Sequence, residues 1–234
     1  MSPADRETRF VWEVMDDRAA MLRDIEEEVA LTRREIGKQA LDERVMAAMA
    51  KVPRERFVPE SQRVLAFRNG PVPIGHGQTI SQPYIVALMS DLVEPRPDST
   101  ILEVGTGSGY QAAVLAQLVR QVYSVEIVAA LAQAAGERLE RMGYDNVTVR
   151  HADGYHGWKE HAPFDGIVVT AAAPHIPQPL IEQLKPGARL VIPVGLPGCV
   201  QMLKVLEKRA DGSCSSRDVL MVAFVPLTRA SPDP

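Results

Sequence analysis

The stretch Ile101 to Tyr110, ILEVGTGSGY, decides the fold of this chain. Its first residues, including Ile101, Leu102 and Val104, are typical of a short buried strand. The alternate glycines that follow allow a tight turn and a close approach of the backbone to a ligand. A helix is expected to begin near Gln111, so that its free N–H groups face the same pocket. The pattern is G-x-G-x-G rather than the dinucleotide pattern G-x-G-x-x-G, and it predicts a nucleotide-cofactor loop.

Two acidic residues accompany this loop. Glu103 lies near the end of the strand before the glycines, and Glu126 ends the next apolar segment, about 20 residues after Gly105. This is the spacing of the acid that binds a ribose in such units. We therefore expect Gly105, Gly107, Glu103 and Glu126, with the adjacent Ile127, to bind the cofactor's amino group and ribose.

The chain around the loop alternates strands and helices, which predicts a doubly wound α/β fold with a mostly parallel sheet. Strands are expected at 100–104, 121–125, 147–151, 166–170 and 189–194. Helices are expected at 83–92, 110–118, 129–142 and 179–184. Alternating residues at 201–208 and 219–226, with Asp211 and Gly212 between them, predict an antiparallel hairpin at the sheet edge.

The N-terminal region precedes this pattern. Val11, Met15, Leu22, Ile25 and Val29 recur at helical spacing and predict an amphipathic helix over 8–34, which Gly37 ends. A second helix is expected at 42–51, and 69–82 is expected to be a loop. The first helix is either an oligomer or partner contact or an extra helix packed on the domain, and the second interpretation is favoured. We expect a helical extension at 1–36, one domain at 37–228 and a flexible tail at 229–234.

Composition restricts the class of protein. The chain has 234 residues, a formal net charge of −4 and a pI near 5.8, which disfavours a general nucleic-acid surface. The two cysteines, Cys199 and Cys214, form neither a disulfide framework nor a zinc motif. The charged N-terminus lacks a signal-peptide pattern, and no apolar run has membrane-spanning length. A cytoplasmic protein is expected.

The loop PIGHGQTISQP, residues 73–83, is the second chemically informative segment. Ser81 precedes Gln82 and Pro83 at the start of an expected helix. The pattern favours Ser81 as the N-cap of that helix. The alternative is a hydroxyl directed into the cofactor pocket, and a cap does not exclude this role.

Asp153 and Gly154 follow the third expected strand, at the carboxyl edge where open α/β sheets bind ligands. Asp153 is either a bond acceptor for an adenine amine or a solvated turn residue. The histidines His151, His156 and His161 lack the spacing of a metal site, so no metal is expected. No G-x-S-x-G motif is present, which argues against a hydrolase with Ser81 as its nucleophile.

Together these segments resemble the protein-L-isoaspartate O-methyltransferases, class I enzymes with a Rossmann-like fold that use S-adenosylmethionine. The resemblance covers about residues 37–227. The matching runs are VPRERFVP at 52–59, PIGHGQTISQPY at 73–84, ILEVGTGSGYQAA at 101–113, ADGYHGW at 152–158, the segment 164–195 with its TAAAP run, and FVPL at 224–227.

The resemblance implies a role for each matching residue. Ser81 corresponds to the residue assigned to the active site, and Glu126 to the residue that holds the ribose hydroxyls. Asp153 and Gly154 correspond to the residues that meet the adenine. The other positions implied to line the pocket are Gln78, Thr79, Ile80, the glycine loop at Gly105, and Thr228.

The implied reaction is methylation of the free carboxylate of L-isoaspartyl residues in aged proteins and peptides, which starts their repair and releases S-adenosylhomocysteine. Such a carboxylate is ionised at neutral pH, because the reference pKa of a carboxyl group is about 4, so no general base is required. The alternatives are a methyltransferase of a small molecule or of nucleic acid, and a non-catalytic scaffold. The run TAAAP lacks the polar acceptor expected of amino methylation in nucleic acids, and the intact cofactor loop disfavours a scaffold.

Overall fold

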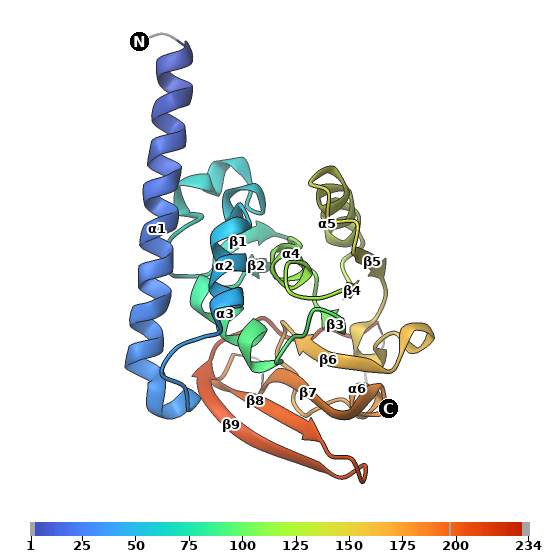
Figure 1. Cartoon of the computed structure of the whole chain (residues 1–234). Helices are drawn as coiled ribbons and strands as arrows, with labels where there is room; N and C mark the ends of the chain where they lie inside the picture. The colour runs from blue at the N-terminus through green and yellow to red at the C-terminus, as the bar shows by residue number, and fades with distance from the viewer. Residues whose placement is uncertain (1–2, 197, 231–234) are drawn as a thin grey trace.

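The computed structural model describes residues 3–196 and 198–230, and it contains a seven-stranded sheet with helices on both faces (Figure 1). The strand order is β5-β4-β3-β6-β7-β8-β9. Neighbours from β5 to β7 are parallel, and β8 and β9 are antiparallel to their neighbours. The large-sheet strands are β3 (Thr100–Val104), β4 (Gln121–Glu126), β5 (Val147–His151), β6 (Phe164–Val169), β7 (Leu184–Val194), β8 (Gln201–Lys208) and β9 (Cys214–Val222). The predicted fold class is confirmed.

The helices connect these strands and precede them. The α-helices are α1 (Pro3–Ile36), α2 (Glu43–Lys51), α3 (Pro83–Leu92), α4 (Tyr110–Ala116), α5 (Ala129–Arg141) and α6 (Gln178–Glu182). The 3₁₀ turns are η1 (Arg54–Arg56), η2 (Glu60–Leu65), η3 (Gly154–His156) and η4 (Lys159–His161). No helix among the described residues has the length and apolar character needed to cross a membrane.

Alternate residues of the central strands enter two separate hydrophobic clusters. Ile101 packs with the cluster that includes α1 to α4, whereas its neighbour Leu102 packs with Trp158 and Leu180 on the opposite face. A strand directs successive side chains to opposite faces, so a central strand covered on both sides is largely apolar. All five residues of β3 are accordingly buried, and Glu103 is its one charged residue.

Helix α1 is longer than the predicted 8–34 and packs on the domain over its second half. Ile25 and Val29 are buried in the same cluster as α3, while Leu31 is 78% exposed. Gly37 ends the helix: it has a φ of 71°, and its N–H donates to the Arg33 carbonyl oxygen. Val11 and Met15 lie outside the described side chains. The interpretation as a helix packed on the domain is confirmed for the described part.

The predicted 69–82 loop is wrong in part, because it contains a small antiparallel hairpin. Its strands are β1 (Val72–Gly75) and β2 (Gln78–Ile80), and His76 and Gly77 form the turn with positive φ values. The short β2 ends immediately before Ser81, so this hairpin determines where the Ser81 segment begins.

The second strand of the C-terminal hairpin begins earlier than predicted, at Cys214 rather than at 219, and ends at Val222. The turn explains the difference: Asp211 Oδ1 accepts the Ser213 N–H at 2.9 Å, and Gly212 has a φ of 83°. Residues beyond β9 leave the hairpin, and Pro226 pairs with Ala172 near the carboxyl ends of the parallel strands. The C-terminal segment therefore reaches the edge of the sheet where the glycine loop lies.

Smaller boundary errors share one cause. The last predicted helix extends to Leu184, but α6 ends at Glu182 and Leu184 instead begins β7. Similarly, Thr170 was predicted within a strand but follows β6. Leucine and threonine occur in helices, in strands and in the segments between them, so the local sequence pattern alone does not locate these boundaries.

Candidate cofactor and methyl-transfer site

The glycine loop follows β3 and lies against the end of β6. Gly105 has a φ of 98°, and a Cβ there would collide with Thr170 Oγ1. That hydroxyl lies 2.5 Å from the Gly105 carbonyl oxygen. Glycine is therefore required by the backbone conformation and by the close approach of two strand ends.

Glu126 fixes the loop from the end of the neighbouring strand. One carboxylate oxygen accepts the Gly107 N–H at 2.7 Å and the other accepts the Val128 N–H at 2.9 Å. Each oxygen retains a further lone pair. Glu126 thus orients the loop and can also accept hydroxyl groups from a ligand.

A narrow cavity of about 50 Å³ opens along this edge. The predicted residues that line it are Gln78, Thr79, Gly105, Gly107, Glu126, Ile127, Gly154 and Thr228. Thr170 and the segment 225–227 also line it, and these were not predicted as site residues. The FVPL run was the only sequence signal for that segment.

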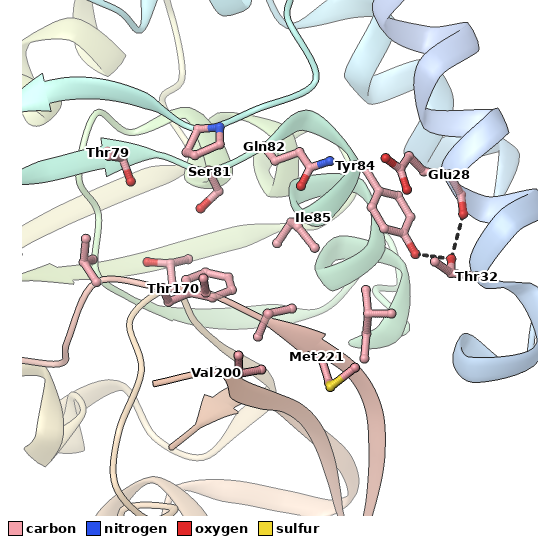
Figure 2. Close-up of a pocket in the computed structure, with 16 residues that line it drawn as sticks. Glu28, Thr32, Thr79, Ser81, Gln82, Tyr84, Ile85, Thr170, Val200 and Met221 are labelled. Atoms are coloured by element: carbon pink, nitrogen blue, oxygen red, sulfur yellow. Dashed lines mark hydrogen bonds between the residues drawn. The ribbon is translucent and has the colours of Figure 1, made fainter. Parts of the chain in front are cut away.

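Ser81 lies beside the loop, but it is not the helix cap that the sequence favours. The N-cap of α3 is Gln82, and no side chain caps the helix there. The Ser81 side chain instead lines both a small cavity next to Gly105 and a much larger cavity of about 610 Å³ (Figure 2). Ile80 lines the small cavity as well. The interpretation of Ser81 as a hydroxyl at the pocket is the one that agrees with this placement.

Arg54, which sequence reasoning missed, holds the Ser81 segment in place. Its side chain is fully buried and donates to the carbonyl oxygens of Ala66 and Ser81, each at 2.6 Å. The guanidinium also lies 4.7 Å from the ring centroid of Tyr110, the first residue of α4. Burial lowers the pKa of Arg54. The Arg54 side chain therefore connects the Ser81 segment to the helix that follows the glycine loop. The only feature of the sequence that pointed to Arg54 was the run VPRERFVP, which resembles the family.

Glu103 does not line any of these cavities. It is fully buried, and it accepts a hydrogen bond from Ser124 Oγ. Burial raises its pKa to about 8. Ser124 in turn bonds Thr106 of the glycine loop at 2.5 Å, so Glu103 lies beneath the loop, and its contact with the cofactor stays a prediction.

Asp153 lies next to the pocket, with its carboxylate already hydrogen-bonded. Oδ1 accepts the Tyr155 N–H at 3.0 Å, and Oδ2 accepts the Ala230 N–H at 3.1 Å. Oδ2 also lies 3.4 Å from Nε of Arg229, whose guanidinium is 3.6 Å from the Tyr155 ring centroid. Gly154 reaches the cavity wall, whereas Asp153 holds the C-terminal segment beside it. Neither the turn interpretation nor the adenine interpretation predicted that contact.

The described residues contain no group of three or more His, Cys, Asp or Glu side chains placed to hold a metal ion. The cofactor cavity lies at the carboxyl edge of the parallel sheet. Its described lining combines apolar side chains with Gln78, three threonines and one carboxylate, Glu126. Such an arrangement suits a nucleoside-containing cofactor.

Residues 26–231 match the family model described as protein-L-isoaspartate(D-aspartate) O-methyltransferase. The chain belongs to this family. The match begins within α1, before the boundary at residue 37 that the sequence motifs suggested.

Relatives of the protein-L-isoaspartate O-methyltransferase family support the assignment over most of the chain. Protein-L-isoaspartate O-methyltransferase 2 of Syntrophobacter fumaroxidans is 64% identical over 90% of this chain and 85% of its own length. The protein of the same name from a Polaromonas species is 62% identical over 89% of this chain and 99% of its own length.

Solved structures agree. A protein-L-isoaspartate O-methyltransferase structure superposes with a TM-score of 0.78 at 26% identity, over 89% of this chain, which spans 65% of that longer protein. A Plasmodium falciparum structure, described as a putative member in complex with S-adenosyl-L-homocysteine, gives a TM-score of 0.71 at 27% identity, over 88% of this chain and 97% of that one.

Proposed function

We propose that this chain transfers the methyl group of S-adenosylmethionine to the free carboxylate of L-isoaspartyl residues in damaged proteins and peptides. The observation that carries the proposal is the position of Ser81. It stands between the glycine-loop cavity and the 610 Å³ cavity, so a cofactor on one side and a peptide on the other would meet there. Family membership supplies the identity of the substrate.

S-adenosylmethionine supplies an electrophilic methyl group on its sulfonium. The chain's own contribution is to bind and orient. We assign the ribose hydroxyls to Glu126, because its carboxylate is positioned by two backbone N–H groups and keeps free lone pairs. Gly154 is assigned to the adenine face of the cavity, where a Cβ would collide with Val104.

The reaction needs no general base, because the accepting carboxylate is an anion at neutral pH. Alignment of that oxygen with the methyl group and exclusion of water are the remaining requirements, and orientation can contribute up to about 7–11 kcal/mol. We assign this alignment to the Ser81 hydroxyl, acting through a hydrogen bond without covalent modification. Arg54 acts through Ser81 as a positioning residue.

The cofactor cavity adjoins the two cavities that Ser81 lines, because all three share Thr79 and Thr170. Its residue types fit the cofactor. The segment 225–228 forms one wall and follows the last strand of the sheet. We assign this wall to the cofactor.

The decisive experiment supplies labelled S-adenosylmethionine with an L-isoaspartyl peptide and with its aspartyl isomer. Label transfer to the first peptide alone supports the proposal. If folded protein that binds S-adenosylhomocysteine transfers label to neither peptide, the proposal is contradicted. A small-molecule acceptor is then the remaining candidate.

Three earlier expectations remain predictions: a cytoplasmic location, the division at residues 36 and 228, and oligomer formation through α1. The described part of α1 buries its apolar residues within its own chain, leaving Leu31 as an exposed large apolar side chain.

A further inference from the structure

The 610 Å³ cavity extends from Ser81 to the helix α1, well beyond the point of methyl transfer (Figure 2). Ser81, Thr79 and Thr170 lie at one end, and Glu28 and Thr32 of α1 lie at the other. A volume of this size exceeds what one carboxylate needs. It has room for residues that flank the isoaspartyl residue in a peptide.

The walls between the two ends are mostly apolar. Leu220, Val222 and Phe224 contribute from β9 and the segment after it, and Ile85 contributes from α3. At the same cavity, Val200 is 69% exposed and Met221 is 71% exposed. These surfaces can contact aliphatic parts of a peptide, but they do not select for charge.

Glu28 is the single charged residue among the described residues that line this cavity. Asn69 Nδ2 donates to its Oε1 at 3.2 Å, which orients the carboxylate. The Thr32 hydroxyl contacts the Glu28 carbonyl oxygen at 2.7 Å and the Tyr84 hydroxyl at 2.5 Å, so this stretch of α1 is connected to α3. Among the described residues, no Lys or Arg forms an ion pair with Glu28.

A partly buried carboxylate without a cationic partner attracts a cation more strongly than an exposed one, because solvent screens it less. We propose that Glu28 makes the far end of this cavity a subsite for a basic side chain, Lys or Arg, near the isoaspartyl residue of the substrate. The aliphatic stem of that side chain lies along the apolar wall, and its charged end pairs with Glu28. This inference rests on the proposed function.

The test compares peptides that each contain one L-isoaspartyl residue and carry Lys, Gln or Glu in turn at each of the three positions on either side. With the wild-type chain we expect at least one position where Lys gives a kcat/KM about tenfold above that of Glu. Glu28→Gln should reduce this ratio to within about twofold, and Glu28→Lys should reverse it.

Glu27→Lys is the matched control, because Glu27 is the exposed neighbour on the same helix and the change in net charge is equal. It should keep the wild-type preference. A wild-type chain without preference at any position, or a Glu28→Lys chain that keeps the preference, would overturn the inference.

The two proposals fail in different ways. If the function is wrong, no peptide is methylated, including those with Gln. If only the subsite is wrong, all peptides are methylated without regard to charge. Binding of S-adenosylhomocysteine and thermal unfolding confirm that each variant is folded, and Glu28→Gln keeps the test decisive if the charge reversal proves unstable.

Discussion

At the scale of single residues, the sequence allows two interpretations of Ser81, a helix N-cap or a hydroxyl at the pocket. Its position before Gln-Pro favours a helix cap, yet the structure assigns the N-cap to Gln82 and leaves the Ser81 side chain at two cavities. The buried Arg54 holds its carbonyl oxygen from behind. The hydroxyl is thereby presented by a restrained backbone.

Replacing Ser81 with Ala should lower kcat for an isoaspartyl peptide by about 100-fold, the usual effect of removing one aligned hydrogen-bonding group. The Kd for S-adenosylhomocysteine, measured by calorimetry, should change by less than about threefold. Ser216→Ala, on the exposed part of β9, serves as the control. A covalent adduct trapped on Ser81 would refute the orienting role.

Glu103 should make stability depend on pH. Its pKa, raised to about 8 by burial from a reference value of 4.5, means that the folded protein keeps a proton which the unfolded chain releases. The contribution to stability is therefore present below pH 4.5 and lost as pH rises to about 8, by up to about 1.4 kcal/mol per pH unit.

Glu103→Gln cannot release this proton. Its free energy of unfolding, measured in urea without ligand, should rise relative to the wild type between pH 5 and pH 8. Glu137→Gln, an exposed change on α5, should show a difference that is independent of pH. If the difference in free energy of unfolding between Glu103→Gln and the wild type is also independent of pH, Glu103 is ionised in the folded protein.

At the scale of elements, the loop between β3 and α4 lies against the end of β6. This close approach is possible because Gly105 has no Cβ to collide with Thr170. Hairpin β1–β2, α3 and the segment after β9 then bring Thr79, Ser81 and residues 225–228 to the same loop. These segments are distant in sequence and meet only at the carboxyl edge of the sheet.

Gly105→Ala should destabilise the protein more than Gly143→Ala. Both positions have positive φ values, 98° and 76°, but a Cβ at Gly143 has open space, whereas one at Gly105 collides with Thr170. Left-handed strain alone costs about 1–2 kcal/mol, which is the expected effect at Gly143. Only Gly105→Ala should weaken binding of S-adenosylhomocysteine, by tenfold or more. Equal losses of stability, measured by urea unfolding, would contradict the close-approach argument.

At the scale of the whole molecule, α1 and the C-terminal segment form two sides of a site whose base is the parallel sheet. Glu28 belongs to the first structural element and Thr228 lies after the last strand, yet both line cavities that share Thr79 and Thr170. Binding should therefore couple the two ends of the chain.

Saturation with S-adenosylhomocysteine at about 100 times its Kd should add about 2.7 kcal/mol to the free energy of unfolding. Hydrogen exchange of the amides at 225–230 should slow in the same experiment, because the ligand restrains the wall that Asp153 holds through Ala230. The exposed turn 209–213 should exchange at an unchanged rate. Unchanged exchange at 225–230 would contradict the assignment of this segment as a wall of the cofactor site.

Short-range chemistry made several features predictable from sequence. Four features depend on residues close together in the chain, where period, glycine and proline act directly: the glycine loop, the acid at the end of β4, the bounds of α3 and β3, and the alternation of strands and helices. Glu126, Gly154 and Thr228, which the sequence assigns to the cofactor site, line the cavity, and their roles stay predictions.

The remaining features depended on contacts between distant segments. Glu103 lies beneath the loop because Ser124 of the neighbouring strand binds it, and Asp153 holds Ala230 because the chain returns to the sheet edge after β9. Glu28 reaches the cavity only because α1 packs beside α3 and β9. Local patterns predict which side chains are available; tertiary packing decides which of them meet, since burial and charge pairing are properties of the folded neighbourhood.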